Sequence, residues 1–190
     1  MRPTRDEYFM MLALVVSTRS TCARRAVGCV LVDNGGRVLS TGFNGVARGM
    51  VHCHGSDAVA PCPAALAPSG TGLDGCHAIH AEQNALLQTR GGTEAVHTCY
   101  VTVSPCVTCV KLLMNTGCER VAFLDPYPHE DVAAALWLAS RRPKRAGVPR
   151  QRLRAWDAVA RTWRIQMAES IQGSGRRGGL PVESTETMVY

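Results

Sequence analysis

The sequence has 190 residues, 46% of them hydrophobic, which is enough for one compact domain with a real core and short for two. The formal net charge is +6, but residues 141–164 carry nine Lys and Arg against one Asp, so the charge belongs to one segment and does not predict nucleic-acid binding by the whole chain. The apolar stretch from Tyr8 to Val16 is too short to span a membrane and lacks a cleavage site, so we expect a cytoplasmic protein without membrane contacts.

The first part of the chain predicts a helix followed by a β-hairpin. Thr4 and Glu7 have the spacing of a capping box, which favours a helix that ends near Thr18. Two apolar runs, 27–32 and 38–43, flank the turn sequence Asp-Asn-Gly-Gly, as expected of two strands joined by a tight turn.

An irregular stretch separates the hairpin from a region of alternating elements. Residues 45–75 are rich in Gly, Pro, Cys and His and keep no period, so something must hold this long loop, and a metal ion is the obvious candidate. The pattern beyond it predicts a helix over 77–88, a strand over 97–103, a helix over 106–115 and a strand over 120–124. This alternation predicts a layered α/β fold.

The last part of the chain predicts one more helix and a tail. Apolar residues recur at helical spacing between Leu153 and Met167 with arginines on other faces, which favours a basic amphipathic helix over about 150–168. The polar, Gly-rich sequence of residues 171–190 is typical of disorder. We therefore expect a single domain over residues 1–170.

Two short motifs supply the residue types of a catalytic metal site. His80 and Glu82 open one predicted helix, and Cys106 and Cys109 open the next, directly after Pro105. Three ligands, His80 and the two cysteines, would leave the fourth position of a tetrahedral zinc open, which is typical of catalytic sites. The pattern H-x-E with P-C-x-x-C is the signature of zinc nucleobase deaminases, so we predict that Glu82 is the proton shuttle of a hydrolytic deamination.

The zinc motif alone leaves other functions open. A structural zinc knuckle is one, although closed structural sites use four protein ligands and would give Glu82 no role. The same chemistry also serves tRNA adenosine deaminases and free-base or nucleoside deaminases, and the arginine-rich segment could attract RNA. A non-enzymatic, zinc-stabilised binding module would keep the fold without activity, but the presence of Glu82 favours an enzyme.

Longer stretches, between about residues 8 and 127, resemble the deoxycytidylate (dCMP) deaminases of bacteria and phages. The similar segments are 20–28 (STCARRAVG), 40–45 (STGFNG), 52–53 (HC), 79–85 (IHAEQNA) and 100–106 (YVTVSPC). The resemblance implies hydrolysis of dCMP to dUMP and ammonia for thymidylate synthesis. A substrate substituted at C5 stays open, because a pocket discriminates a methyl group by only about 1–3 kcal/mol.

The resemblance also implies a fold, an assembly and effectors. The fold would be a cytidine deaminase-like three-layer α/β/α sandwich with a mixed central sheet, to which the C-terminal amphipathic helix is added. The partners would be the deoxycytidine nucleotide and further copies of the chain, often as a hexamer, and nucleic acid is not the expected partner. Regulated members respond to dCTP and dTTP, which makes these nucleotides, with Mg²⁺, candidate effectors.

The resemblance assigns residues to the substrate and to a second metal. Asn44 would contact the sugar, Tyr127 would line the pocket, and Arg90, or instead Arg24 or Arg25, would bind the 5′-phosphate. Cysteines that hold a structural zinc in many relatives correspond to Cys22, Cys53 and Cys76. Candidates for the fourth ligand of that zinc are Cys62, which we favour, His52, His54 and His77.

Overall fold

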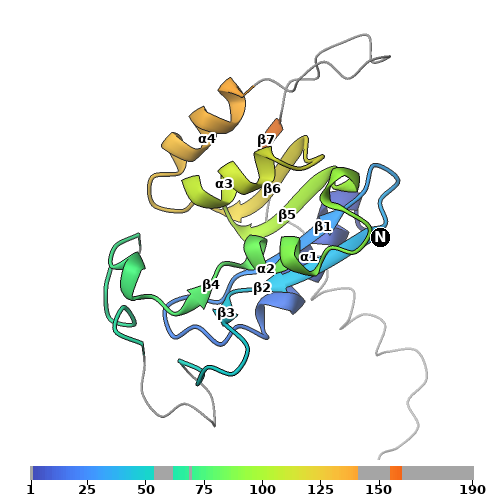
Figure 1. Ribbon diagram of the computed structural model, residues 1–190. Helices are drawn as coiled ribbons and strands as arrows, with labels where there is room; N and C mark the ends of the chain where they lie inside the picture. The colour runs from blue at the N-terminus through green and yellow to red at the C-terminus, as the bar shows by residue number, and fades with distance from the viewer. Residues whose placement is uncertain (1, 54–61, 69, 141–154, 160–190) are drawn as a thin grey trace, which may run out of the picture.

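A five-stranded sheet lies between two helical layers in the computed structural model, which describes residues 2–53, 62–68, 70–140 and 155–159 (Figure 1). The helices are α1 (Arg5–Ser17), α2 (Ala81–Gln88), α3 (Val107–Met114) and α4 (Glu130–Ala139), with short 3₁₀ turns at Leu73–Gly75 and Thr93–Ala95. The strands of the main sheet are β1 (Gly28–Val32), β2 (Val38–Phe43), β5 (Thr98–Val103), β6 (Arg120–Asp125) and β7 (Ala155–Ala158). A separate pair joins β3 (Gly45–Val46) to β4 (Ala78–Ile79).

The main sheet is mixed, as predicted. Its strand order is β2-β1-β5-β6-β7. Strand β1 runs antiparallel to both of its neighbours, while β5, β6 and β7 are parallel to one another. Parallel neighbours need crossover connections, and α3 supplies the crossover between β5 and β6.

Each face of the sheet packs against its own helices. On one face, Phe9, Met10 and Ala13 of α1 pack against side chains such as Val30 and Tyr100 of the central strands. On the other face, buried residues of α2, α3 and α4 pack against the alternate side chains of the same strands. The predicted three-layer α/β/α arrangement is thereby confirmed.

The helix expected over 150–168 is wrong at Ala155–Ala158, which form β7. Trp156 reaches the sheet core all the same, because its ring lies 5.5 Å from that of Phe123 and 6.5 Å from that of Trp137. Pairing with β6 satisfies backbone groups that a lone helical turn would leave open, as in the 2.9 Å hydrogen bond from the Ala155 N–H to the Glu119 carbonyl. The other residues of that helix and the tail over 171–190 lie outside the described residues.

Two further elements differ from the sequence prediction. The helix expected from His77 begins only at Ala81, because residues 78–79 pair with β3 and His80 has the extended conformation of an N-cap. Helix α4 was not predicted, although Glu130 and Asp131 carry the negative charge that favours a first helical turn.

Within the described residues, none of the helices has the length and apolar character that crossing a membrane requires.

Candidate functional site

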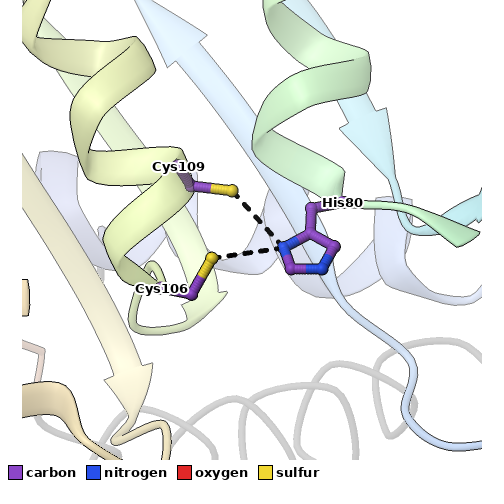
Figure 2. Close-up of side chains that lie close together, drawn as sticks. All are labelled: His80, Cys106 and Cys109. Atoms are coloured by element: carbon purple, nitrogen blue, oxygen red, sulfur yellow. Dashed lines mark hydrogen bonds between the residues drawn. The ribbon is translucent and has the colours of Figure 1, made fainter. Parts of the chain in front are cut away.

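The two predicted motifs meet where helices α2 and α3 begin. His80 immediately precedes α2, and Cys106 immediately precedes α3, which follows the carboxyl end of β5. Cys109 lies in the first turn of α3 and is buried. Figure 2 shows the sulfur atoms of both cysteines facing one ring nitrogen of His80 from the neighbouring helix. This edge of the sheet is where open α/β folds usually bind ligands.

Close packing of α2 on the sheet fixes the position of His80. A β-carbon at Gly42 of β2 would lie 2.3 Å from the Ala85 nitrogen, so only glycine allows the helix to approach this closely. The Asn84 amide donates to the Phe43 carbonyl at 2.8 Å, and the His80 backbone N–H donates to the Gln83 amide oxygen at 2.9 Å. Two hydrogen bonds therefore hold the start of α2, one from the His80 backbone and one from the Asn84 side chain.

The ligand atoms of His80, Cys106 and Cys109 all lie within 4.8 Å of one another. The Nδ1 atom of His80 is 3.5 Å from the Cys106 sulfur and 3.4 Å from the Cys109 sulfur. Tetrahedral zinc with its usual bond lengths holds a nitrogen and a sulfur ligand about 3.5 Å apart, so the spacing and the donor types of this trio fit zinc.

The trio already favours negative charge on one sulfur. A hydrogen bond from Cys109 and the neighbouring His80 lower the pKa of the Cys106 thiol, against the effect of burial. The same contact with Cys106 raises the pKa of His80. Thiolate is the form in which cysteine binds metal, so this arrangement prepares the site for a cation.

Glu82 lies beside the trio and is 4% exposed. Burial raises the pKa of its carboxyl group to about 7, although the nearby His80 charge opposes the shift. A carboxyl group with a pKa near neutrality both takes and gives a proton at working pH, which is what general acid–base catalysis requires. The sequence prediction of Glu82 as a proton carrier agrees with this environment.

A cavity of about 280 Å³ opens beside these residues. His80, Glu82 and Cys106 line it, as do Arg24 and Arg25 of the loop between α1 and β1. Its volume is close to the lower end of the range of about 300–1,000 Å³ that is typical of small-molecule pockets. The cavity is therefore lined by two of the three candidate metal ligands, a buried acid and two cations.

The predicted pocket residue Tyr127 lines the cavity together with Arg25. The guanidinium carbon of Arg25 lies 5.8 Å from the centre of the Tyr127 ring, in cation–π range. The Tyr127 backbone N–H donates to the Ser104 hydroxyl at 2.8 Å. Sequence reasoning missed Ser104, whose position directly before Pro105 and the cysteine motif was the available signal.

Asn44 also lines the cavity and is 8% exposed. Its side-chain oxygen accepts from the Val27 backbone N–H at 2.8 Å, and its amide nitrogen donates to the Arg25 carbonyl at 2.6 Å. An amide group has two donor hydrogens, so Asn44 can hold Arg25 with one and offer the other to a ligand.

Not every residue predicted to bind the substrate lines the cavity. Arg90 is exposed beyond the end of α2 and is not among the residues that line the described cavity. The residues Ala65 and Ala67, which the sequence did not single out, form part of the cavity wall instead. The carbonyl of Pro68, in the same segment, accepts a 2.5 Å hydrogen bond from Arg24.

The four cysteines assigned to a second metal lie in one region. Cys53 and Cys62 form a buried cluster against which Cys76 packs, and Cys62 is hydrogen-bonded to both of these thiols. Buried Cys22 is close enough to act electrostatically on Cys53. Among the described residues, only the His80 trio brings three ligand atoms within 4.8 Å, so these four thiols are spaced more widely.

The histidines considered for this second site are placed less favourably. His77 is exposed, His52 is half-buried, and His54 lies outside the described residues. The contacts of Cys62 therefore favour it as the fourth member of the group.

Comparison with known proteins gives the same family by sequence and by structure. Residues 3–125 match the family described as the cytidine and deoxycytidylate deaminase zinc-binding region. The deoxycytidylate deaminase of Mycobacterium phage D29 is 37% identical over 129 residues, which cover 64% of this chain and 95% of the phage protein. The Schizosaccharomyces pombe deoxycytidylate deaminase is 37% identical over 153 residues, which cover 78% of this chain but only 45% of the yeast protein.

Among solved structures, the dCMP deaminase of cyanophage S-TIM5 in complex with dCMP and dUMP has a TM-score of 0.54 and 29% identity. The match covers 72% of this chain and 92% of that protein. The predicted fold type is confirmed by this likeness. The chain thus spans nearly all of the phage relatives and less than half of the yeast one.

Proposed function

Because the chain belongs to the cytidine and deoxycytidylate deaminase family, we propose that it hydrolyses dCMP to dUMP and ammonia. One observation carries the proposal: the cavity lined by Glu82 and by two members of the trio, His80 and Cys106, is also lined by Arg24 and Arg25. The first group provides deamination chemistry, and the two cations provide what a 5′-phosphate needs. The reaction consumes one water and releases one ammonia for each nucleotide.

His80, Cys106 and Cys109 would hold a catalytic zinc ion in this proposal. Two thiolates and a neutral imidazole balance the charge of Zn²⁺, and three protein ligands leave a position for water or substrate. The chemistry that zinc supplies when bound at such a site is Lewis-acid activation of water.

Glu82 would move the protons of the reaction. Its carboxylate takes a proton from the attacking water, delivers it to the ring nitrogen beside the amine-bearing carbon, and then assists the departure of ammonia. Burial supports this role, because a desolvated carboxylate is a stronger base than an exposed one and exchanges its proton near neutral pH.

The nucleotide would be recognised by groups on the loop between α1 and β1 and by its neighbours. Arg25, held over the Tyr127 ring, is the leading candidate for the phosphate, with Arg24 beside it. Asn44 would direct its remaining amide hydrogen to the sugar. Arg90, which is exposed, stays a prediction for the phosphate.

We also retain the second metal as a proposal. Cys22, Cys53, Cys62 and Cys76 would bind a structural zinc ion after a small inward movement of their sulfur atoms. Such an ion would hold the segment that includes Ala65 and Ala67 in the cavity wall, and its binding free energy would contribute to folding.

Three wider predictions belong to this proposal. The protein would act in the cytoplasm as a homo-oligomer, and a hexamer is the state that the resemblance implies. Deoxynucleoside triphosphates with Mg²⁺ would be its effectors.

A substrate panel tests the proposed function. Ammonia release is measured with dCMP, 5-methyl-dCMP, CMP, deoxycytidine and dAMP, using protein of known zinc content. Turnover concentrated on deoxycytidylates supports the proposal, and the 5-methyl compound reports on tolerance at C5. Zinc-loaded protein that is inactive on the whole panel but deaminates a tRNA anticodon stem would overturn the substrate assignment.

A further inference from the structure

The loop that carries the two cavity arginines, residues 20–27, is fastened at both ends to one residue. Near its start, the Thr21 backbone N–H donates to the Asn44 carbonyl at 3.3 Å. Near its end, Asn44 donates its backbone N–H to the Val27 carbonyl at 3.1 Å and its amide N–H to the Arg25 carbonyl at 2.6 Å. Asn44 therefore joins the start of the loop to its end.

The orientation of the Asn44 amide follows from its partners. The Val27 backbone N–H can only donate, so the side-chain atom that it meets at 2.8 Å is the oxygen, and the nitrogen must face the Arg25 carbonyl. A second hydrogen bond reaches the same oxygen from the Ser20 hydroxyl at 2.7 Å. Ser20 thus helps to fix the direction in which Asn44 holds Arg25.

The Ser20 hydroxyl also connects other parts of the loop. Its single hydrogen has the Asn44 carbonyl at 2.9 Å and the Arg25 carbonyl at 3.3 Å as further acceptors. Its oxygen accepts from the Cys22 backbone N–H at 3.3 Å. The Ser20 hydroxyl therefore contacts the loop at Cys22, before the two arginines, and at Arg25, and it links these positions to Asn44.

Ser20 itself is not among the residues that line the described cavity, whereas Arg25 and Asn44 are. Its influence on a ligand must therefore pass through these two residues. The Arg25 backbone is held by Asn44, and its guanidinium group stands over the Tyr127 ring. A change in the backbone at Arg25 would move the guanidinium group away from that ring and from the cavity.

We propose that Ser20 is a positioning residue that sets Arg25, through Asn44, for recognition of a phosphate group on the substrate. This inference rests on the proposed function, because it takes a nucleoside monophosphate as the ligand of the cavity. It assigns to Ser20 a contribution to the choice of nucleotide over nucleoside and no contribution to the chemical step.

The test compares Ser20→Ala with the parent protein on dCMP and on deoxycytidine, which lacks the phosphate. We expect the KM for dCMP to rise about 5- to 10-fold, because a hydrogen bond of ordinary strength is lost, while kcat stays within about twofold. The kcat/KM for deoxycytidine should change much less than that for dCMP, because the Asn44 amide keeps its hydrogen bond from the Val27 N–H and so stays directed at the sugar. Ser20→Thr, which keeps the hydroxyl group, should restore the KM for dCMP.

A double-mutant cycle with Arg25→Ala tests whether Ser20 acts through that arginine. Ser20→Ala should add nothing to the KM of an Arg25→Ala protein. The control is Ser40→Ala, which removes a 2.9 Å hydrogen bond to Thr89 at a buried site away from the cavity. Thermal melting of each variant checks that the fold is kept.

Two kinds of result would contradict the role of Ser20, and they differ in what they mean for the proposed function. Equal losses on dCMP and deoxycytidine, or additive effects of Ser20→Ala and Arg25→Ala, overturn the role of Ser20 and leave the proposed function standing. A parent protein that turns over deoxycytidine as well as dCMP, and is unaffected by Arg25→Ala, overturns the phosphate assignment and the role of Ser20 with it.

Discussion

The first turn of α2 lies so close to β2 that a β-carbon on Gly42 would come within 2.3 Å of the Ala81 carbonyl oxygen. Ala81 stands between His80 and Glu82, so the closeness of this contact sets the distance of both catalytic candidates from the sheet. The missing side chain at Gly42 is therefore part of the site geometry, although it touches no substrate.

Replacement of Gly42 by alanine should weaken both stability and activity. The added methyl group meets backbone atoms that cannot rotate away, so α2 must shift, at a cost of about 1–3 kcal/mol in the free energy of unfolding. Denaturant unfolding and kcat measured on the same samples check this. Gly35→Ala, in the exposed turn after β1, is the control and should leave kcat unchanged; equal loss in both variants would contradict the argument.

Replacement of Glu82 by glutamine should abolish most turnover while keeping the fold and the metal. Glutamine has nearly the same shape but cannot accept or deliver the proton, so kcat should fall by about 10²- to 10⁴-fold. Steady-state kinetics with parallel zinc analysis separates the two effects. The same substitution at exposed Glu94 should be silent. A Glu82→Gln protein as active as the parent would remove the proposed mechanism.

Replacement of Cys62 by alanine should lower the zinc content from about two ions per chain to about one. The remaining ion should stay with the His80 trio, while loss of the second lowers the melting temperature because its binding free energy contributes to folding. Elemental analysis of purified protein gives the count. Cys118→Ala changes a buried core thiol outside this cluster and should keep the metal content. A parent protein with about one zinc ion would rule out the structural site.

Arg25→Ala and Arg90→Ala distinguish the two phosphate candidates. Loss of a charge-assisted hydrogen bond to the phosphate should raise the KM for dCMP about 10- to 100-fold in the Arg25 variant. The Arg90 variant should resemble the parent if phosphate recognition stays within one chain, because Arg90 is exposed and outside the cavity lining. Initial-rate measurements over a range of dCMP concentrations decide between them, and a larger effect at Arg90 would reverse the assignment.

The stability of the fold at acid pH should depend on the contact between Asp6 of α1 and Arg120 of β6. Arg120 donates to both carboxylate oxygens of Asp6, at 2.7 and 2.8 Å, and these hydrogen bonds lower the pKa of Asp6 despite partial burial. A carboxyl group with a lowered pKa in the folded state stabilises the fold above its unfolded-state pKa of about 3.9 and loses that contribution as pH falls further.

Because the Asp6 side chain is 37% exposed and solvent screens its charge, Asp6→Asn should reduce the free energy of unfolding by about 1 kcal/mol at neutral pH and flatten its decline below about pH 4. Urea unfolding at a series of pH values provides the measurement. Asp74→Asn, at an exposed position, is the matched control. If the free energy of unfolding falls in parallel for Asp6→Asn and the parent down to about pH 2, the Arg120 contact does not govern the loss of stability in acid.

The candidate metal trio of His80, Cys106 and Cys109 could be predicted because its signals are local. Cys106 and Cys109 are three residues apart, so any helix that begins there brings them to one face, and Glu82 follows His80 at fixed spacing. The hairpin of β1 and β2 was predictable for the same reason, since its turn sequence and flanking strands are contiguous.

Strand β7 could not be recognised because its reason to exist lies elsewhere in the chain. Trp156 pairs in register with Val121 of β6, and its indole N–H donates to the Glu130 carboxylate at 2.7 Å. Neither partner is visible from the local pattern, in which Trp156 equally fits a helical period. The hydrogen bonds of Ser20 were missed likewise, because its partner Asn44 is distant in sequence.

Strand β7 is also the last strand of the described sheet to be synthesised, which affects folding during translation. It enters the chain about 30 residues after β6 ends, and until it arrives β6 presents an unpaired edge and Phe123 lacks its ring contact with Trp156. Such an edge can pair with another chain. During synthesis the chain would therefore pass through an aggregation-prone intermediate until Ala155–Ala158 leave the ribosome. A shortened protein that ends before these residues would tend to aggregate, even though every catalytic candidate is present.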